Sequence, residues 1–439
     1  GKVMASPITY FLKKTIFKKR IEKIKKSLNL YKCKNSDEIV KFQVKKFNYF
    51  WEKAYNSHAF YKMWKKSYQL PDKISYISEI SNFPILNKKI INENSNLIFP
   101  QNNKYRVTYT GGTSGVTTKF PTDNIESFNA YIMSYTGRLW WNIEPLSEIL
   151  MLWGHSHLFQ GGFKGKVQYY QRLIKDFIIN TKRISSYNLS ESNLDSFYKL
   201  INNLQPPTII SYSGNIFKLA KYMDENNLKF KFGKIQNVIV TSETIYSKDI
   251  EIIKKKFANN VINEYGMAET GVIGYSQNKT QNIKIFWSNF ILTKNNNNNL
   301  YLSTISNRVF PLINYDTEDK VKTKFVKEKS ILTIREIQGK TRNNLSIKLK
   351  NGSTISVSTI FFDHFLKYFP NIYSVQYKIL KDEIYIVLNT NGYVDINEIY
   401  IKCIEKLSKD FGIPDENKLN IKFGESTKTV AGKHSIFLQ

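Results

Sequence analysis

Apolar residues between positions 190 and 270 follow two different spacings along the chain. A helical face, repeating every three or four residues, comes first in Leu194, Phe197, Leu200, Ile201 and Leu204. It ends before Pro206, which is a helix stop signal. Strand-like runs at 208–212, 235–241 and 261–263 then alternate with helical patterns at 216–223 and 248–257. This β-α-β-α-β order predicts an α/β fold with a doubly wound, mostly parallel sheet, whose ligands bind beyond the carboxyl ends of its strands.

The remaining patterns divide the chain into parts. From about Leu300, shorter strand-like segments predict a β-rich part that ends a large domain. Strands near Ile347 and 384–388 and a helix near 396–409 then predict a small α+β domain. We therefore expect three parts, namely a basic amphipathic segment at 1–40, a large domain at 41–338 and a small C-terminal domain at 339–439.

The N-terminal segment concentrates positive charge. Its cations, Lys13, Lys14, Lys18, Lys19, Arg20, Lys23, Lys25 and Lys26, alternate with apolar residues at helical spacing. Such a helix either packs on the domain by its apolar side, which the pattern favours, or lies on an anionic membrane surface. Elsewhere the lysines are scattered, so the net charge of +29 does not by itself indicate nucleic-acid binding.

Length and composition are typical of a folded protein with more than one domain. The 439 residues are 41% hydrophobic and 14% aromatic. No apolar run is long enough to cross a bilayer, and no charged-then-apolar secretion signal opens the sequence. Cys33 and Cys403 are far apart in sequence, which argues against a disulfide framework or a zinc cluster. We expect a cytoplasmic protein, with peripheral membrane contact as the alternative role of the basic helix.

The segment YTGGTSGVTTK, residues 109–119, has a composition suited to holding phosphate. Its glycines let backbone N–H groups turn inward, its hydroxyls add donors, and Lys119 supplies charge. The spacing differs from a Walker A loop, and the Gly-x-Gly-x-x-Gly of dinucleotide-binding turns is absent. A flexible surface turn is the alternative interpretation. The parts of a nucleotide site that follow downstream favour phosphate binding.

The segment EYGMAE, residues 264–269, follows one of the predicted parallel strands. Tyr265 could cover a purine, Gly266 permits close backbone approach, and Glu269 could hold Mg²⁺ bridged to phosphate oxygens. A buried tyrosine and a glutamate paired with a lysine explain the same residues equally well. The triplet 241–243 ends a neighbouring strand, so both segments should share one rim of the sheet.

Two further positions carry candidate charges. Asp319, in PLINYDTED (311–319), could accept both ribose hydroxyls, although a turn cap is the simpler interpretation of that segment alone. Lys433, in KTVAGKHSIF (428–437), follows a glycine and could stand between a carboxylate and an α-phosphate. There it would offset the repulsion between two anions. A lone lysine in so basic a chain would otherwise be solvated.

Taken in order, these segments resemble the motifs of the adenylate-forming superfamily of acyl-CoA synthetases, adenylation domains and luciferases. The loop fits (Tyr/Ser)-Thr-(Ser/Gly)-Gly-Thr-(Thr/Ser)-Gly-x-x-x-Lys. Residues 185–223 resemble the helix–Pro–strand–helix segment of the phenylacetate–coenzyme A ligase-like branch, which includes CapK-type proteins of capsule and surface-polysaccharide gene clusters. The similarity covers about residues 42–439 and implies an acyl-CoA synthetase-like fold with a mobile small domain.

The resemblance also implies a role for each matching residue. The residues that would wrap the β- and γ-phosphates of ATP are Thr110, Gly111, Gly112, Thr113, Ser114, Gly115 and Lys119. Those that would border the adenine are Ser242, Glu243, Thr244, Asn263, Glu264, Tyr265, Gly266 and Met267. Glu269 would bind Mg²⁺, Asp319 would bind the ribose, and Lys433 would drive adenylation before the small domain rotates away. Lys340 stands where the family usually has arginine, and Arg342 falls at the hinge. His155, Gly161 and Gly162 would line the carboxylate pocket.

The chain departs from the family pattern in three places. Ala268 replaces a threonine or serine hydroxyl, the hinge motif Gly-Arg-x-Asp-Asp becomes GKTRN at 339–343, and Thr-Gly-Asp becomes TED at 317–319. The resemblance still implies an ATP- and Mg²⁺-dependent ligase that passes an acyl group to coenzyme A. The alternatives are amide or ester formation on a sugar of a surface polysaccharide, a catalytically weak ATP-binding homologue, and a basic scaffold for nucleic acid or anionic lipid.

Overall fold

The computed structural model describes residues 7–32, 34–102, 104–109, 118–153, 179–185, 193–241, 245–277, 280–323, 329–340, 344–358, 371–390 and 392–424, with a few positions between 362 and 369. Its helices are α1 (Pro7–Ile16), α2 (Lys18–Lys32), α3 (Ser36–Ser57), α4 (Ala59–Ser67), α5 (Lys88–Glu93), α6 (Ser95–Ile98), α7 (Asn124–Leu139), α9 (Leu194–Leu204), α10 (Ser213–Glu225), α11 (Ser247–Lys256) and α13 (Ile396–Asp410). Its strands are β1 (Arg106–Tyr109), β2 (Lys119–Thr122), β3 (Ile149–Trp153), β4 (Thr181–Ser185), β5 (Thr208–Tyr212), β6 (Ile235–Thr241), β7 (Ala258–Met267), β8 (Gly271–Ser276), β9 (Ile283–Ile285), β10 (Phe290–Lys294), β11 (Asn299–Thr304), β12 (Tyr315–Lys322), β13 (Thr333–Ile334), β14 (Glu336–Lys340), β15 (Asn344–Lys348), β16 (Thr354–Ser358), β17 (Ile372–Leu380), β18 (Glu383–Thr390) and β19 (Leu419–Phe423).

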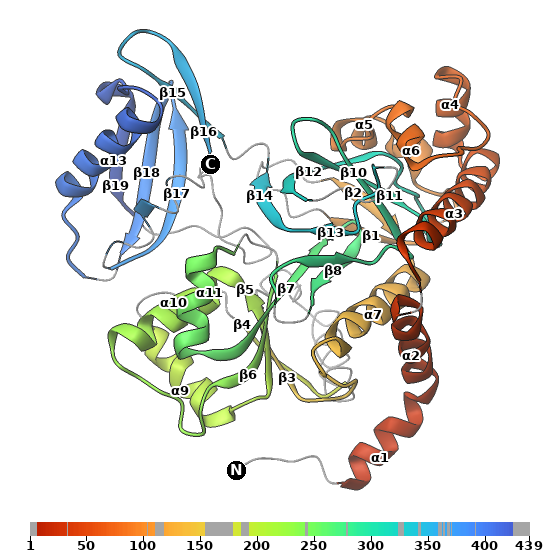
Figure 1. The fold of residues 1–439 in the computed structure, drawn as a ribbon, viewed down its shortest axis with the longest axis horizontal. Coiled ribbons are helices and arrows are strands. Elements are labelled where there is room, and N and C mark those ends of the chain that lie inside the picture. Colours follow the sequence, from red (N-terminus) through yellow and green to blue (C-terminus); the bar gives the residue numbers. More distant parts are fainter. Residues whose placement is uncertain are drawn as a thin grey trace.

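A large mixed sheet runs through the centre of the molecule in the order β13-β9-β8-β7-β6-β5-β3-β4. Strands β4, β3, β5, β6 and β7 pair in parallel, whereas β7, β8, β9 and β13 pair antiparallel. The parallel half contains the β-α-β-α-β segment, whose helices α9, α10 and α11 lie together on one side of the sheet (Figure 1). The predicted α/β, doubly wound fold is confirmed.

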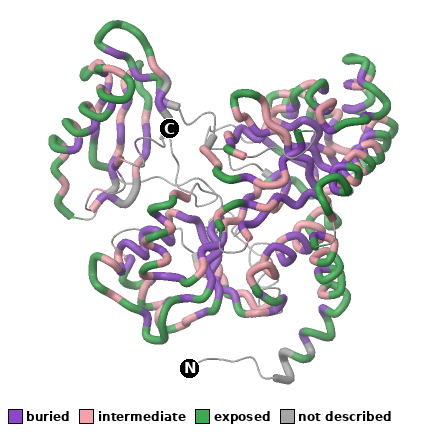
Figure 2. The backbone as a smooth tube through the Cα atoms, viewed as in Figure 1, coloured by how far each residue is buried: buried purple, intermediate pink, exposed green. Residues whose placement is uncertain are grey.

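Strands β5 and β6, in the middle of the parallel half, are buried on both faces, which is why they read as nearly unbroken apolar runs. On β6, Val238 belongs to the core under α9, α10 and α11, whereas its neighbour Ile239 belongs to the core on the opposite face. That second core also takes Ile132 and Met133 of α7. The buried positions run through the middle of the sheet in Figure 2.

A second, antiparallel sheet has the order β10-β11-β12-β14 and shares the larger core with the N-terminal helices. Gln43 of α3 is fully buried and connects this helix to the segments around the antiparallel sheet. Its amide donates to the carbonyls of Trp287 (3.2 Å) and Phe290 (3.0 Å), and its oxygen accepts from Ser330 Oγ (2.9 Å). A fully bonded buried amide fixes the position of α3 on this sheet.

Helix α2 packs on α7 by its apolar side. Ile24 and Tyr31 are buried, and Thr136 of α7 donates a 2.9 Å hydrogen bond to Ser27. On α1, by contrast, Phe11 is 69% and Ile16 is 73% exposed. Within the described ranges, no helix combines the length and apolar content that crossing a bilayer requires.

The C-terminal part has its own core between the sheet β17-β18-β19 and α13. This is the small α+β unit that the sequence patterns predict, although the boundaries at residues 40 and 338 remain predictions. Lys221 of α10 reaches this part. Its ammonium donates to the backbone oxygens of Ile372 (2.8 Å) and Phe369 (3.3 Å).

Candidate active site

The two ends of the glycine-rich loop are joined by the hairpin of β1 and β2. Tyr109 pairs with Lys119 across this hairpin. Residues 110–117 lie outside the described residues. Thr118 is buried and Lys119 is exposed. Directly after β2, Asp123 caps α7 by accepting from the backbone N–H of Glu126 (2.9 Å), so the loop is positioned by a strand pair that leads into a capped helix.

Residues 264–267 continue strand β7 instead of leaving the sheet as a loop. The parallel pairing of β6 with β7 ends at Thr241 opposite Glu264, and beyond this point β7 pairs with the antiparallel β8. The expected loop is a strand because β8 supplies its hydrogen bonds. Gly266 is required there, since a Cβ would lie 2.7 Å from the carbonyl oxygen of Gly271. Residues 242–244, predicted to share this rim, lie outside the described residues.

Tyr265 and Asp319 meet between the two sheets. The Tyr265 hydroxyl donates to Asp319 Oδ2 at 2.6 Å, and the two residues are only 7% and 8% exposed. Burial and then the charge of Asp319 raise the pKa of Tyr265 well above its ordinary value, so the phenol stays a donor. The residues predicted for the adenine and the ribose are thus in contact. Asp319 also pairs in register with Lys340 of β14, whose side chain is outside the described part.

Glu269, the predicted Mg²⁺ ligand, is held by two residues that the sequence patterns did not single out. The Tyr315 hydroxyl donates to Glu269 Oε1 at 2.7 Å, and the Arg308 guanidinium donates to the Glu269 backbone oxygen. Arg308 also forms an ion pair with Glu126 of α7 at 3.2 Å. Tyr315 lies inside the segment 311–319, only four residues before Asp319, so its position in the sequence could have marked it as a neighbour of the site. No sequence signal marks Arg308.

These donors fit a magnesium ion bound largely through phosphate. Mg²⁺ keeps several waters and needs only one or two protein carboxylates when phosphate oxygens complete its octahedron. Glu269 is 5% exposed, and only its Oε1 is used by Tyr315. Among the residues that the structure describes, no group of three His, Cys, Asp or Glu gathers as a self-contained metal site. Glu269 can therefore hold the ion as a single carboxylate ligand.

The other side of β7 carries a second, partly buried hydrogen bond. The Tyr275 hydroxyl of β8 donates to the Glu264 carboxylate, and burial followed by Glu264 raises the pKa of Tyr275 well above its ordinary value. Asn263 is fixed through its backbone N–H, which donates to Ser276 Oγ at 2.8 Å. The remaining predicted residues, His155, Gly161, Gly162, Arg342 and Lys433, lie outside the described residues.

This architecture is the fold of the adenylate-forming acyl-CoA ligases. It superposes on 2-hydroxyisobutyryl-CoA ligase in the postadenylation state, in complex with 2-HIB-AMP, with a TM-score of 0.65 at 12% identity, over 90% of this chain and 88% of that one. The anthranilate CoA ligase AuaEII in complex with anthranoyl-AMP gives a TM-score of 0.50 at 13% identity, over 75% of this chain and 65% of that one. At such identities the likeness defines the fold alone.

In sequence, the chain is similar to Protein CapK of Staphylococcus aureus. The two are 27% identical over 282 residues, which is 63% of this chain and 59% of CapK. No family model matches the chain. The resemblance to adenylate-forming, CapK-type proteins is thereby confirmed at the level of sequence similarity and fold.

Proposed function

We propose that this chain is an ATP- and Mg²⁺-dependent ligase that activates a carboxylic acid as an acyl-adenylate. The observation that carries the proposal is that two buried hydrogen bonds hold Tyr265, Asp319 and Glu269, in a fold common to adenylate-forming ligases. Tyr265 and Asp319 are in direct contact, and Tyr315 of the same strand as Asp319 holds Glu269.

In the proposed first step, a carboxylate oxygen attacks the α-phosphorus of ATP, and the bond to the β-phosphate oxygen breaks to release pyrophosphate. Glu269 would hold Mg²⁺, and the ion would supply positive charge to offset that of the phosphates. Asp319 would accept the ribose hydroxyls and fix the nucleotide. Lys119 at the phosphate loop and Lys433 near the carboxylate would offset the charge of the two reacting anions.

The buried partners explain how this site would keep its shape without a ligand. Tyr265 orients one oxygen of Asp319, and Tyr315 orients one oxygen of Glu269. Both carboxylates are therefore oriented before the ribose or Mg²⁺ would bind. Such preorganisation lowers the reorganisation needed when charge develops at the α-phosphate.

In the proposed second step, a nucleophile attacks the acyl carbon and AMP leaves. The thiol of coenzyme A is the first candidate, because 2-hydroxyisobutyryl-CoA ligase has been crystallised with 2-HIB-AMP and CoA. An amine or hydroxyl of a sugar is the second candidate, which the similarity to CapK suggests. It would give the chain a role in capsule or surface-polysaccharide synthesis. The phenylacetate–coenzyme A ligase-like assignment belongs to the first candidate.

The test is ATP–pyrophosphate exchange with a panel of carboxylic and amino acids. Exchange should depend on one class of acid and on Mg²⁺. It should be lost in Lys433→Ala and kept in Lys428→Ala, which removes a neighbouring lysine of the same segment. Exchange that survives in Lys433→Ala would reject the role of Lys433. ATP binding with no pyrophosphate from any acid would reject the ligase and leave an ATP-binding homologue.

Acceptors are tested after a substrate acid is known. Coenzyme A and amino sugars are added separately, and AMP release together with the acylated product is scored by mass spectrometry. A thioester supports the first candidate, and an amide or ester on the sugar supports the second. This order separates failure of activation from failure of transfer.

We also propose that α1 places the protein against an anionic membrane surface. The exposed Phe11 and Ile16 lie on the same helix as Lys14, and Lys18 and Lys19 follow directly. An apolar pair flanked by cations suits the headgroup region of anionic lipid. Full-length protein should sediment with vesicles that contain phosphatidylglycerol and not with phosphatidylcholine alone, and Phe11→Ser with Ile16→Ser should abolish this. Equal sedimentation of the double variant would reject the surface.

A further inference from the structure

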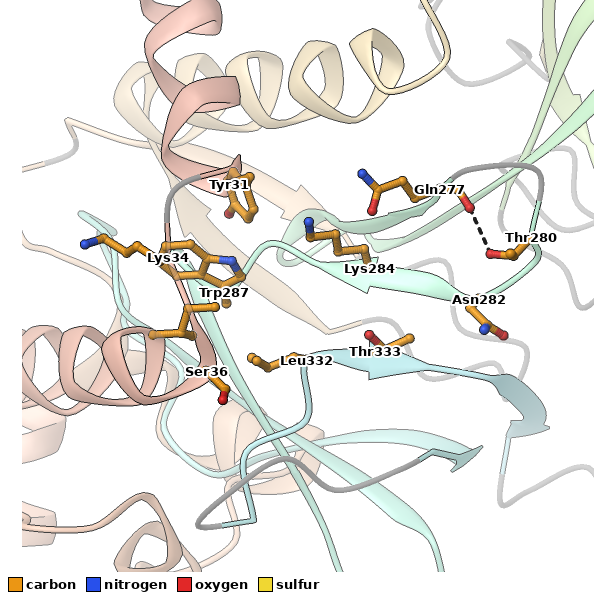
Figure 3. Close-up of a pocket in the computed structure, with 11 residues that line it drawn as sticks. Tyr31, Lys34, Ser36, Gln277, Thr280, Asn282, Lys284, Trp287, Leu332 and Thr333 are labelled. Carbon is orange, nitrogen blue, oxygen red and sulfur yellow. Dashed lines mark hydrogen bonds between the residues drawn. The ribbon is translucent and has the colours of Figure 1, made fainter.

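A pocket of about 470 Å³ with both polar and apolar walls lies at the β13-β9-β8 end of the large sheet, away from β5 and β6. The segment between α2 and α3, the end of β8, and strands β9 and β13 form its walls (Figure 3). The residues that line it are Tyr31, Lys34, Ser36, Ile39, Gln277, Thr280, Asn282, Lys284, Trp287, Leu332 and Thr333. None of these residues is assigned to the proposed ligase chemistry.

The charge of this pocket is one-sided. Lys34 and Lys284 line it, and no carboxylate is among its lining residues in the described part of the chain. Figure 3 shows the Lys284 ammonium between Gln277 and Tyr31. It lies 5.2 Å from the ring centre of Trp140 and 5.9 Å from that of Tyr31, which stabilise a cation but do not neutralise it. Burial lowers the pKa of Lys284, as expected of an ammonium without a counter-ion.

The uncharged polar groups of the pocket suit a solute with several hydroxyls. Amides of Gln277 and Asn282 both donate and accept, and so do the hydroxyls of Ser36, Thr280 and Thr333. Thr280 Oγ1 donates to the Gln277 backbone oxygen at 2.8 Å, which fixes the turn between β8 and β9. The pocket therefore offers cations and neutral hydrogen-bonding groups on the same walls.

The rings at the base of the pocket are rigid. The centres of Tyr31 and Trp287 are 4.9 Å apart, and the Tyr31 hydroxyl bonds to Ser288 Oγ at 2.7 Å. Both residues are almost fully buried. A pocket with a fixed base and a cation held in place loses little entropy on binding, which favours a specific ligand over a loosely held counter-ion.

The pocket is separate from the candidate nucleotide site, but residues paired across strands β7, β8 and β9 run from one to the other. Lys284 lies opposite Tyr275 on β8, and Tyr275 lies opposite Glu264 on β7. Two strand spacings place the backbones of Lys284 and Glu264 about 10 Å apart. Glu269 is farther away, because it precedes the start of β8, whereas Gln277 follows its end. A ligand at Lys284 would therefore not be the ATP phosphates held near Glu269.

We propose that this pocket binds a small polyhydroxylated anion, a monosaccharide-sized solute that carries a phosphate or a carboxylate. The phosphate or carboxylate pairs with Lys284, the hydroxyls bond to Gln277, Asn282 and Thr333, and Lys34 adds positive charge at the other side of Trp287 (Figure 3). This proposal does not depend on the ligase activity. It can hold for a catalytically inactive chain and can fail for an active one.

Isothermal titration calorimetry of the full chain tests the proposal with glucose 6-phosphate, glucuronate and glucose. At least one of the two anions should bind saturably, and neutral glucose should bind about tenfold or more weakly because it lacks the charge-assisted bonds. Whichever anion binds more tightly identifies the acid group. Absence of saturable binding for both anions, or equal binding of glucose, overturns the proposal.

Three variants connect the binding to this pocket. Lys284→Met should weaken the anion about tenfold or more, and Lys284→Arg should retain it, because the charge is kept. Lys89→Met, which removes an exposed lysine of α5, is the matched control and should bind like the parent chain. Binding that Lys284→Met leaves unchanged lies at another anion site and overturns the assignment.

A fourth variant keeps the test decisive if Lys284→Met does not fold. Asn282→Asp keeps the shape of the side chain and introduces a carboxylate into the pocket. It should repel the anion and weaken its binding, with the far-ultraviolet circular dichroism unchanged. Unchanged affinity in a folded Asn282→Asp protein also overturns the proposal.

Discussion

Arg308, which bonds to the Glu269 backbone, forms a buried ion pair with Glu126, and a substitution can test how much this pair stabilises the fold. Its side chain and that of Glu126 are each 7% exposed and lie 3.2 Å apart. Methionine at position 308 would keep much of the apolar packing but leave Glu126 buried without its counter-ion. Removal of one partner from a buried pair costs about 3–5 kcal/mol, so we expect Arg308→Met to lower the free energy of unfolding by that amount at pH 8.

The loss should depend on pH in a defined direction. Burial raises the pKa of Glu126, against the opposing pull of Arg308 and two backbone hydrogen bonds. Without Arg308 this pKa rises further. The folded variant then binds a proton at pH values where the unfolded chain does not, so its stability falls as the pH rises above the ordinary carboxyl range. The deficit relative to the parent chain should be smallest at about pH 5 and largest at about pH 8.

Urea unfolding followed by tryptophan fluorescence measures the effect, with Glu126→Gln and the double variant completing a cycle. Glutamine retains the helix-cap function of position 126, where Glu126 accepts from the backbone N–H of Asp123 at 3.2 Å. The double variant should be more stable than Arg308→Met alone. A coupling energy below about 0.5 kcal/mol at pH 8 would show that the two charges act independently and would refute the reasoning.

Three further perturbations probe other parts of the structure. Tyr265→Phe removes the donor to Asp319 and should cost about 1–3 kcal/mol of stability and raise the KM for ATP more than it lowers kcat; an unchanged KM would contradict the ribose role of Asp319. Burial lowers the pKa of His58 to about 4, so stability should fall by about 2 kcal/mol between pH 7 and pH 5, as thermal unfolding can follow. His58→Gln should remove this dependence, and a slope that persists would assign it elsewhere. Lys221→Met removes the bonds to Phe369 and Ile372 and should speed amide exchange in β17 about tenfold, measured by mass spectrometry; unchanged exchange would show that the contact does not stabilise the small domain.

Strands β5 and β6 of the parallel half were predictable because both are buried on both faces. The apolar runs at 208–212 and 235–241 coincide with β5 and β6, and the helical pattern at 396–409 matches α13. Strand β7 is longer than the predicted 261–263. Asn259 and Asn260 interrupt its apolar pattern, and the antiparallel β8 extends it through Met267. Strands β3 and β4 were not predicted.

Short sequence motifs predicted individual residues of the candidate site but not the contacts between them. Tyr265, Glu269 and Asp319 were singled out from short segments, but their contacts join residues 46 to 54 positions apart. The spacing of apolar residues contains no information about such pairs. Arg308 and the pocket around Lys284 were missed for the same reason, because strand pairing and helix packing assemble them from distant segments.

Tyr31 has a consequence for how the N-terminal region can be shortened. It lies in the last turn of the cationic helix α2, and its ring lies against Trp140, Phe286 and Trp287. A truncation that removes this tyrosine would hydrate three indole or phenyl surfaces of the main body. Trimming that stops within α1 would reduce the positive charge and keep these contacts, whereas a cut that releases the end of α2 would loosen the packing around Trp140, Phe286 and Trp287.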